Sequence, residues 1–499
     1  MQTTLSSAEM SVPYATPVRP DTFEPKGHYY PRVLHAQVHP LVSFFLRMTT
    51  KQIIHRYCHL NPKVDPSRLR SVLEHRTEQL TWAGADLFYT TTDTGARRMV
   101  VLETNSCPSG NKSMPMLTDD DEQGGYRRLL EYSFLPRLKK RGLPKGGLAV
   151  LYDKNSIEAS GYAATLADLC GETVYLVPLP QGRTDVPARF TAGVPELRPE
   201  SGQWLAIRAA FRYVTQRPWT RIPVRTKTLM FNPVLGCLAG GRNKMMAAKA
   251  YEFFNAELSG TGLSIRTPET IRDVRWEEIP LWVRRFGGYA VVKNPYSNAG
   301  QGVWTLSSEE DLQKFLELEH DYDRFIVQGL IGNSGWTSKH EGSRFYHVGT
   351  MPDRQGKIYV ADLRMMVTSG PQGFRPISIY ARRAVAPLTE DPKSADSWAM
   401  LGTNLSTKSA SGGWDADTDR LILMDRKDFN RLGLGPDDLL EAYIQSVLSV
   451  LAIDQMARKL TTSKGGLSRR LFKSMNDDSK LMSEILKGDT TTSSVLPSP

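Results

Sequence analysis

A short segment that ends in two polar residues places the strongest constraint on this sequence. Residues 98–110 read Arg-Met-Val-Val-Leu-Glu-Thr-Asn-Ser-Cys-Pro-Ser-Gly, so an apolar strand leads directly to Glu103 and Asn105. Side chains two residues apart point to the same face of a strand. Carboxylate and carboxamide oxygens are hard ligands of the kind that Mg²⁺ prefers. We therefore expect a β-sheet with a magnesium site at a strand end.

A second apolar stretch, Leu87 to Tyr89, lies upstream of this strand and is preceded by Asp86. The polar run 90–98, with Asp93 and Gly95, is typical of a turn between two strands. The resulting hairpin would bring Asp86 beside Glu103. The alternative is a solvated hairpin rim with ordinary acidic residues, since most charged side chains are exposed.

A glycine-containing loop almost 200 residues later is the second informative feature. Residues 289–303 read Tyr-Ala-Val-Val-Lys-Asn-Pro-Tyr-Ser-Asn-Ala-Gly-Gln-Gly-Val, a pattern that predicts strand, loop and strand. Lys293 would project from the strand end, and the small residues after it would bring backbone N–H groups close to phosphate oxygens. The loop is not a Walker A motif, because no Gly-Lys-Ser/Thr ends it. A plain β-hairpin turn would show the same pattern.

Together these segments resemble the ATP-grasp superfamily, in which ATP lies between two α+β subdomains. The resemblance implies a magnesium set that consists of Asp86, Glu103 and Asn105. It also implies two ATP lysines and a flexible loop over the phosphates, formed by Lys244, Lys293, Ser297, Gly300 and Gly302.

Three further segments support the same resemblance. Phe325 to Ile331 resembles the hinge strand that binds adenine through its backbone, which implicates Gln328, Gly329 and Leu330. Many relatives carry Glu where this chain has Gln328. The segments 362–364 and 377–383 resemble strands that contact phosphates, through Arg364 and one of Arg382 or Arg383. Residues 401–406 resemble a substrate loop, with Asn404 as the substrate contact.

The order of these motifs departs from the usual one. The magnesium set comes first in this chain, as in circularly permuted ATP-grasp proteins such as the glutathionylspermidine-synthetase-like group. Permutation is tolerated where chain termini lie close together at a surface. We therefore expect a mixed α+β and α/β protein with an ATP-grasp fold of permuted topology. A small parallel α/β domain and helical additions at both ends would complete it.

The expected organisation follows the composition along the chain. We predict a flexible arm at 1–26, a helical region at 27–82, and the magnesium-ligand hairpin at 83–115. A small α/β substrate domain would cover 145–234, and the lysine and glycine-loop subdomain 235–335. The rest of the hairpin's subdomain would cover 345–430. A helix would follow at 436–460, and the tail 461–499 would be largely disordered.

The small α/β domain is the expected place for the acid substrate. Arg212, Arg217 and Arg221 are candidate carboxylate ligands, since guanidinium groups bind carboxylates with two parallel hydrogen bonds. Ordinary surface arginines are the alternative. Cys107 has a functional alternative as well, because it follows the Glu-x-Asn segment.

Composition narrows the function classes. The chain has 499 residues, 40% of them hydrophobic and 23% charged, which is an ordinary globular composition. No apolar run of membrane-spanning length and no signal peptide are visible, so a cytoplasmic protein is expected. Its 4 cysteines are scattered and form no zinc or redox motif. The net charge of +10 is spread out, which fits an anionic small molecule better than nucleic acid.

The resemblance implies a ligase that joins a carboxylate to an amine at the expense of ATP, with Mg²⁺ as the cofactor. The γ-phosphoryl group would activate the carboxylate as an acyl phosphate. Glu103, Lys293 and Arg364 would carry the chemistry, and the partners would be small-molecule acids and amines. A phosphotransferase with the same ATP site and a non-catalytic nucleotide-binding protein are the alternatives.

Overall fold

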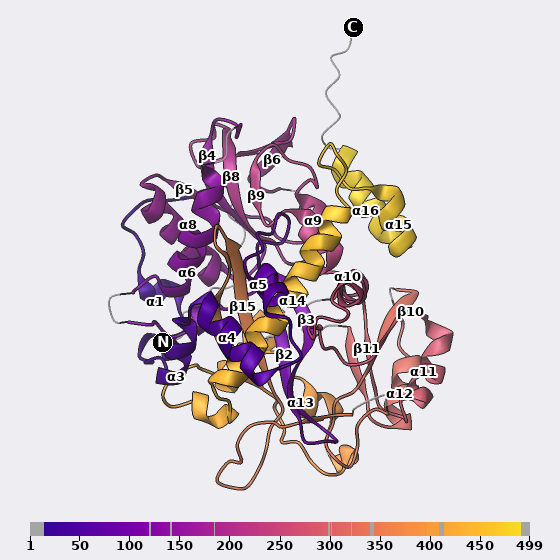
Figure 1. Ribbon diagram of the computed structural model, residues 1–499. Helices are drawn as coiled ribbons and strands as arrows, with labels where there is room; N and C mark the ends of the chain where they lie inside the picture. The colour runs from indigo at the N-terminus through magenta and orange to yellow at the C-terminus, as the bar shows by residue number, and fades with distance from the viewer. Residues whose placement is uncertain are drawn as a thin grey trace.

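Three β-sheets and the helices between them form the molecule (Figure 1). The computed structural model describes residues 14–490 except 119–120, 140–141, 184, 298–299, 301, 321, 340–343, 395 and 409–413. The sheets have seven, four and six strands, and a two-stranded sheet, β17 (Ser406–Lys408) with β18 (Trp414–Ala416), is added to them. The fold is therefore a mixed α+β architecture.

The seven-stranded sheet contains a parallel core. Its order is β5 (Val174–Pro178), β4 (Gly147–Tyr152), β8 (Leu205–Tyr213) and β9 (Leu229–Phe231), all parallel. Helix α8 (Ser156–Cys170) crosses from β4 to β5. The hairpin of β6 (Ala188–Thr191) and β7 (Val194–Leu197) is added to β8. A parallel pair needs such a crossover, and the helix is the element that supplies it.

The six-stranded sheet joins segments that lie far apart in the sequence. Its order is β14 (Phe345–His347), β2 (Trp82–Thr92), β15 (Ala361–Gly370), β16 (Gly373–Arg383) and β19 (Leu421–Ile422). β3 (Arg97–Ser106) pairs with β2 across a turn that contains Gly95 at φ 78°. The register places Asp86 opposite Glu103, as the strand–turn–strand pattern predicts.

A long buried helix supports this sheet. Helix α14 (Pro436–Lys459) contacts β2, β3 and β15. Pro436 occupies its first turn, where the missing N–H costs nothing, and Asp437 and Asp438 complement the positive end of the helix dipole. Its side chains are buried almost all round from Leu439 to Ala457, so it is a core helix.

The four-stranded sheet carries the glycine-containing loop. Its antiparallel order is β10 (Thr270–Arg275), β13 (Arg324–Gly329), β11 (Ala290–Lys293) and β12 (Val303–Leu306). Helices α11 (Ile279–Arg285) and α12 (Glu309–Leu316) pack on it, and α10 (Lys244–Glu257) lies between this sheet and α14. The side chain of Asn243 caps α10 at the N–H of Met246.

Short helices complete the chain. The N-terminal ones are α1 (Pro25–His28), α2 (Pro31–Leu34), α3 (Pro40–Leu46), α4 (Thr50–Leu60) and α5 (Pro66–Leu73). The others are α6 (Gly124–Leu129), α7 (Leu135–Leu138), α9 (Val234–Gly236) and α13 (Ser397–Leu401). Among the described residues, no helix is both long and apolar enough to cross a bilayer.

The predicted flexible arm needs correction from Tyr14 onward. Strand β1 (Thr16–Val18) pairs with β5, and Ala15 is buried. Backbone pairing at the open edge of β5 orders this segment, and Pro17 within β1 is tolerated because β1 is itself an edge strand. Residues 1–13 of the predicted arm lie outside the described residues.

The prediction that the tail is largely disordered is wrong for residues 461–490. Helices α15 (Arg469–Met475) and α16 (Ser479–Thr490) occupy this segment, at the upper right of Figure 1. Three apolar side chains, Phe472, Leu481 and Ile485, are at most 1% exposed and offset the entropy cost of ordering the segment. Residues 491–499 lie outside the described residues.

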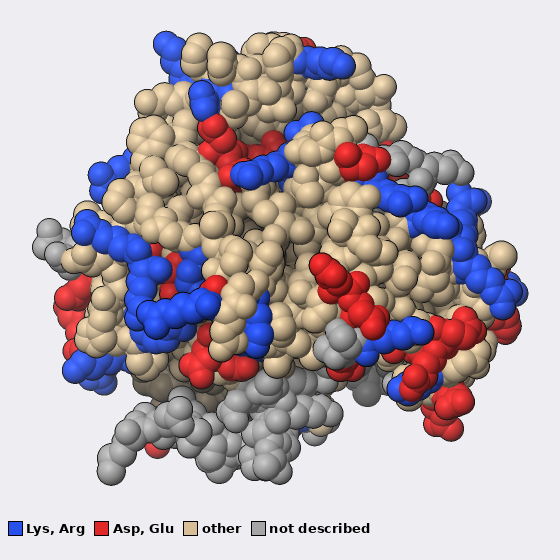
Figure 2. Space-filling view, turned by 90° about the horizontal axis from the view of Figure 1, so that it is seen from below, with Lys and Arg blue, Asp and Glu red and all other residues tan. Residues whose placement is uncertain are grey.

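Charged side chains are spread over the surface. On the face seen from below, basic side chains lie in several separate groups with acidic side chains between them (Figure 2). This distribution on that face differs from the continuous basic stripe that is typical of a nucleic-acid-binding surface.

Candidate functional site

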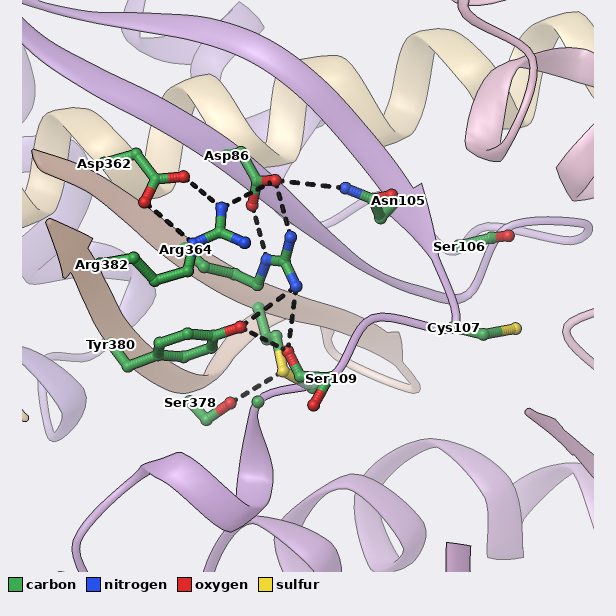
Figure 3. Close-up of polar contacts among 12 residues, drawn as sticks. Asp86, Asn105, Ser106, Cys107, Ser109, Asp362, Arg364, Ser378, Tyr380 and Arg382 are labelled. Atoms are coloured by element: carbon green, nitrogen blue, oxygen red, sulfur yellow. Dashed lines mark hydrogen bonds and ion pairs between the residues drawn. The ribbon is translucent and has the colours of Figure 1, made fainter. Parts of the chain in front are cut away.

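One row of polar side chains crosses the six-stranded sheet. The register places Glu103 of β3 opposite Asp86 of β2, Asp86 opposite Arg364 of β15, and Arg364 opposite Tyr380 of β16. Residues directly opposite one another on neighbouring strands point to the same face. The four side chains therefore form a line on one face of the sheet (Figure 3 shows three of them).

Asp86 is the centre of a buried ion-pair network (Figure 3). Its carboxylate oxygens accept hydrogen bonds from Arg364 Nε at 2.5 Å and Nη2 at 2.7 Å, and Arg382 Nη2 lies 3.1 Å away. Arg382 also forms a bidentate pair with Asp362. Burial by itself would raise the pKa of Asp86, but Arg364 and Arg382 together lower that pKa to about 2. The carboxylate is therefore ionised throughout the neutral range.

The turn after β3 is held by a buried carboxylate. Glu158, on helix α8, accepts hydrogen bonds from Ser109 Oγ at 2.6 Å and from the N–H groups of Gly110 and Asn111, both at 2.8 Å. The carbonyl of Ser109 in turn accepts from Tyr380 Oη at 3.2 Å. The Pro-Ser-Gly turn is thus fixed between the small α/β domain and the six-stranded sheet.

Two lysines from the neighbouring elements approach Glu103. Lys244, the first residue of α10, donates to Ser297 O at 2.5 Å, and its Nζ lies 3.7 Å from Glu103 Oε2. Lys293, the last residue of β11, donates to Gln328 Oε1 at 2.6 Å. Burial lowers the pKa of Lys293 to about 8, against the opposing effect of the Glu103 carboxylate. Residues from two sheets and one helix therefore meet here.

A pocket opens between these elements. Polar and charged side chains line it together with some apolar ones, from β3, α10, β11 and β13. Its lining consists of Leu102, Glu103, Thr104, Gly240, Arg242, Lys244, Ala247, Ala248, Tyr251, Glu252, Asn255, Thr267, Pro268, Glu269, Thr270, Lys293, Ile326 and Gln328. Concave sites in which polar groups converge beside apolar surface are typical small-molecule sites.

The predicted adenine hinge is wrong in one respect. β13 is an interior strand that pairs with β10 on one side and β11 on the other. The N–H of Gly329 donates to Glu269 O, and the N–H of Leu330 donates to Ser338 Oγ. Backbone groups already paired in this way are not available to a base. Gln328 reaches the pocket through its side chain, which also donates to Thr270 Oγ1 at 2.9 Å.

The glycine loop passes close to helix α13. Gly300 and Gly302 have φ of +75° and +63°, values that favour glycine. A Cβ atom on Gly300 would lie 2.8 Å from the ring of Trp398 and 3.4 Å from Asn404 Nδ2. Asn404 therefore lies at this loop. Ser297 takes part through its carbonyl contact with Lys244, while residues 298, 299 and 301 lie outside the described residues.

The predicted substrate arginines are engaged elsewhere. Arg212 is fully buried and contacts Val214 O at 3.0 Å and Cys237 Sγ at 3.1 Å, so its side chain is not accessible for the predicted role of carboxylate ligand. Arg217 pairs with Glu484 of α16 and donates to Tyr322 Oη at 2.5 Å. Arg221 pairs with Asp153 at 3.1 Å. Cys107, which Arg212 contacts at 3.4 Å, is fully buried.

Sequence reasoning missed several basic residues around this site. Arg242 donates to Asn105 Oδ1 at 3.1 Å and to the carbonyls of Ser106 and Cys107. Lys154 and Lys112 lie on the side of the small α/β domain. Lys154 lies two residues after the end of β4, and Lys293 is the last residue of β11, so a position at a strand end was the available signal.

Magnesium fits this arrangement only in part. The three predicted ligands offer hard oxygens, but both oxygens of Asp86 are bound to Arg364, and Asn105 Oδ1 accepts from Arg242. The described residues contain no group of three or more His, Cys, Asp or Glu side chains that could hold a metal. Glu103 fits best, because its cationic neighbour lies at 3.7 Å, beyond hydrogen-bond distance.

Comparisons with known proteins give a distant likeness in fold. No protein-family model and no curated protein matches this sequence. A RimK domain ATP-grasp protein from Sphaerobacter thermophilus has 14% identity and a TM-score of 0.28, over 50% of this chain and 92% of that chain. A glutathione synthetase-like effector from Globodera pallida has 10% identity and a TM-score of 0.36, over 70% and 86%. D-alanyl-alanine synthetase A from Vibrio cholerae has 9% identity and a TM-score of 0.29, over 47% and 88%. TM-scores at this level describe a partial likeness and assign no residue roles.

Proposed function

We propose that the protein is an ATP-dependent carboxylate–amine ligase. One observation carries this proposal: Lys244 and Lys293 meet Glu103 in a single pocket, although they come from separate parts of the fold. Two ammonium groups above one carboxylate suit a triphosphate, since the lysines neutralise phosphate oxygens. The Leu102 and Ile326 side chains in the same pocket offer apolar surface to a base.

The network around Asp86 supplies the second part of the site. Arg364 lies in the same cross-strand row as Glu103, one strand beyond Asp86. Its guanidinium is held rigidly by Asp86 and by Tyr380 Oη at 3.1 Å, so it is preorganised to stabilise developing negative charge. This is the property that transfer of a phosphoryl group to a carboxylate requires. The chain's residues then need only position and neutralise the reactants.

Bound Mg²⁺ would screen the charge of the phosphate oxygens, with Glu103 as the protein ligand of this proposal. Asp86 acts instead as an anchor for Arg364 and Arg382 in the present arrangement. The glycine loop, with Gly300 and Gly302, would cover the phosphates and exclude water.

We also infer that the motif order is circularly permuted. Its support is the position of the β2–β3 hairpin, which precedes the parallel core and the four-stranded sheet in the sequence and yet pairs with β15. Asp86 and Arg364 are 278 residues apart in the sequence, yet they lie on directly adjacent strands.

The test is substrate-dependent release of ADP from ATP. Amino acids, polyamines and small dicarboxylic acids would be screened in pairs of one acid and one amine. Lys293→Met and Glu103→Ala should abolish ADP release, whereas Lys314→Met, which changes an exposed lysine on α12, should retain it. ADP release that needs only an acid, with phosphate kept on the product, would indicate a phosphotransferase. ATP binding without turnover by any pair would contradict the enzyme proposal.

A further inference from the structure

A second group of basic side chains lies near the end of strand β4, where Arg242, Lys112 and Arg364 act on Lys154. In the parallel core the order is β5, β4, β8, so the chain leaves β4 toward β5 on one side while β8 lies on the other. Ligands of such sheets bind at this point, outside the carboxyl ends of the strands. Lys154 lies at this position, two residues after the end of β4.

Lys154 has no charge partner of its own. It makes no hydrogen bond or ion pair with any residue that the structure describes, and it is largely buried. Three of the charged groups that act on it are also cations: Arg242, Lys112 and Arg364. Burial and these neighbours lower the pKa of Lys154 to about 8.

Among the described residues, Asp153 is the carboxylate that acts on Lys154, and it already has other partners. Asp153 accepts hydrogen bonds from the N–H groups of Thr215 at 2.8 Å and Gln216 at 2.6 Å. It also pairs with Arg221 Nη2 at 3.1 Å. A carboxylate held by three partners compensates little of the charge on a fourth group, so Lys154 is left without a counterion.

Lys112 adds to the excess of positive charge. It is 6% exposed, and its Nζ lies 5.0 Å from the centroid of the Tyr30 ring. The nearest buried acid, Glu158, is occupied by the backbone of the Gly110 turn and by Tyr213 Oη at 3.0 Å. Burial alone would lower the pKa of Lys112, but Tyr30 and Glu158 raise it, so Lys112 stays charged and Lys154 is the cation of this pair without a counterion.

Uncompensated buried cations are costly to a folded protein. Such clusters occur where a ligand of opposite charge completes the site. The ordinary alternative, a solvated surface lysine, does not fit Lys112, which is almost fully buried.

We propose that Lys154 and Lys112 bind a second anionic group of the acid substrate, beyond the carboxylate that reacts. The inference rests on the proposed ligase function and names its substrate class: an acid with an additional carboxylate or phosphate. The reacting carboxylate lies toward Arg364, and the second anionic group lies toward the end of β4. The site therefore selects an acid that carries two negatively charged groups.

The test compares acids that differ only in the second charge. Glutamate and glutamine, aspartate and asparagine, and phosphoserine and serine would each be titrated by calorimetry into the protein in the presence of ADP and Mg²⁺. At least one charged member should bind tenfold or more tightly than its neutral counterpart. The pair that responds identifies the second group as carboxylate or phosphate.

Substitutions of Lys154 test whether this site is the source of the selectivity for a second charge. Lys154→Gln should reduce binding of the charged member at least tenfold and leave the neutral member unchanged, while Lys154→Arg should keep most of the selectivity. Lys145→Gln is the matched control, because Lys145 is an exposed lysine that precedes β4 in the same domain. Equal binding within all three pairs, no binding of any charged member, or unchanged selectivity in Lys154→Gln would overturn the proposal.

ATP binding separates this inference from the proposed function. Lys154→Gln should bind ATP as the unmodified protein does, since Lys154 does not line the nucleotide pocket. Charge selectivity that persists without any ADP release would overturn the ligase proposal and leave the anion site standing. ADP release with neutral acids would do the reverse.

Discussion

The Asp86 network and the lysine pocket are neighbours, but they balance charge in opposite ways. Around Asp86, two arginines face two buried carboxylates, and each carboxylate is bound bidentately. In the pocket, Lys244 and Lys293 face Glu103, and Lys244 lies 3.7 Å from it. The first region is complete without a ligand. In the second, two lysines face the single carboxylate of Glu103, and the pocket has room for a ligand.

This difference indicates that the Asp86 network supports the structure and that the lysine pocket binds a ligand. A buried pair that loses one partner leaves an uncompensated charge, so the Asp86 network should matter most for stability. A lysine at a pocket wall has little structural role to lose, so its removal should appear in binding. The two regions can therefore be distinguished by which measurement changes.

The largest effect is expected for Asp86→Asn. The substitution keeps the shape of the side chain but leaves Arg364 and Arg382 without its charge, which costs about 3–5 kcal/mol of unfolding free energy. Urea denaturation measures this loss. Asp437→Asn, which breaks an exposed pair with Arg56, is the control and should change stability little. A loss below about 1 kcal/mol for Asp86→Asn would contradict the structural role of the network.

Lys293→Met should act on the other region. Loss of a charge-assisted phosphate contact costs about 1.5–3 kcal/mol, so ATP affinity should fall roughly ten- to a hundred-fold. Calorimetry with ATP and Mg²⁺ measures it, and Lys314→Met serves as the exposed control. Unchanged ATP affinity in a folded Lys293→Met variant would remove Lys293 from the site.

The turn around Glu103 shows why part of the site could be predicted from sequence. One apolar run, a polar turn and a second apolar run define a hairpin, and the hairpin alone brings Asp86 opposite Glu103. The position of Lys293 at a strand end could be predicted in the same way, from the apolar residues that precede it. These contacts depend on strand periodicity, which is written in the sequence.

The parts that failed depend on neighbours distant in sequence. Nothing local to Arg212 shows that β8 lies in the interior of a sheet. The pairing of β13 with β10 was not predicted, because it joins residues 49 to 58 positions apart in the sequence. The Ser- and Thr-rich composition of the tail led to a prediction of disorder. Phe472, Leu481 and Ile485 are buried there because they pack against other elements.

The pH dependence of ATP affinity gives a further test of the lysine pocket. The pKa of Lys293 is about 8, so its ammonium form predominates below that pH and is lost as the pH rises through it. ATP affinity should therefore weaken above pH 8, by at most about tenfold per pH unit for one proton. Lys293→Met should lack this component. A wild-type affinity that is constant from pH 7 to pH 9.5 would contradict a phosphate contact by this lysine.

The smallest effect is expected where the tail meets the loop that follows Lys293. Tyr296 Oη donates to Asn476 Oδ1 at 3.0 Å, which joins this loop to the segment between α15 and α16. Tyr296→Phe should cost about 0.5–1.5 kcal/mol of stability, measured by thermal unfolding. Tyr175→Phe is the control, because the Tyr175 hydroxyl makes no hydrogen bond with the described part of the chain. Equal melting temperatures of the two variants would show that the tail does not fix the loop.

The most direct test of the ligase proposal is chemical trapping of the activated acid. A carboxylate that has accepted the γ-phosphoryl group reacts with hydroxylamine, which replaces the amine substrate and gives an acyl hydroxamate. With an acid identified by ADP release, hydroxamate should form only with ATP and Mg²⁺, in step with ADP and free phosphate, and should be absent in Glu103→Ala. ATP consumption that leaves the phosphate on a stable product, with neither hydroxamate nor amide, would contradict the account.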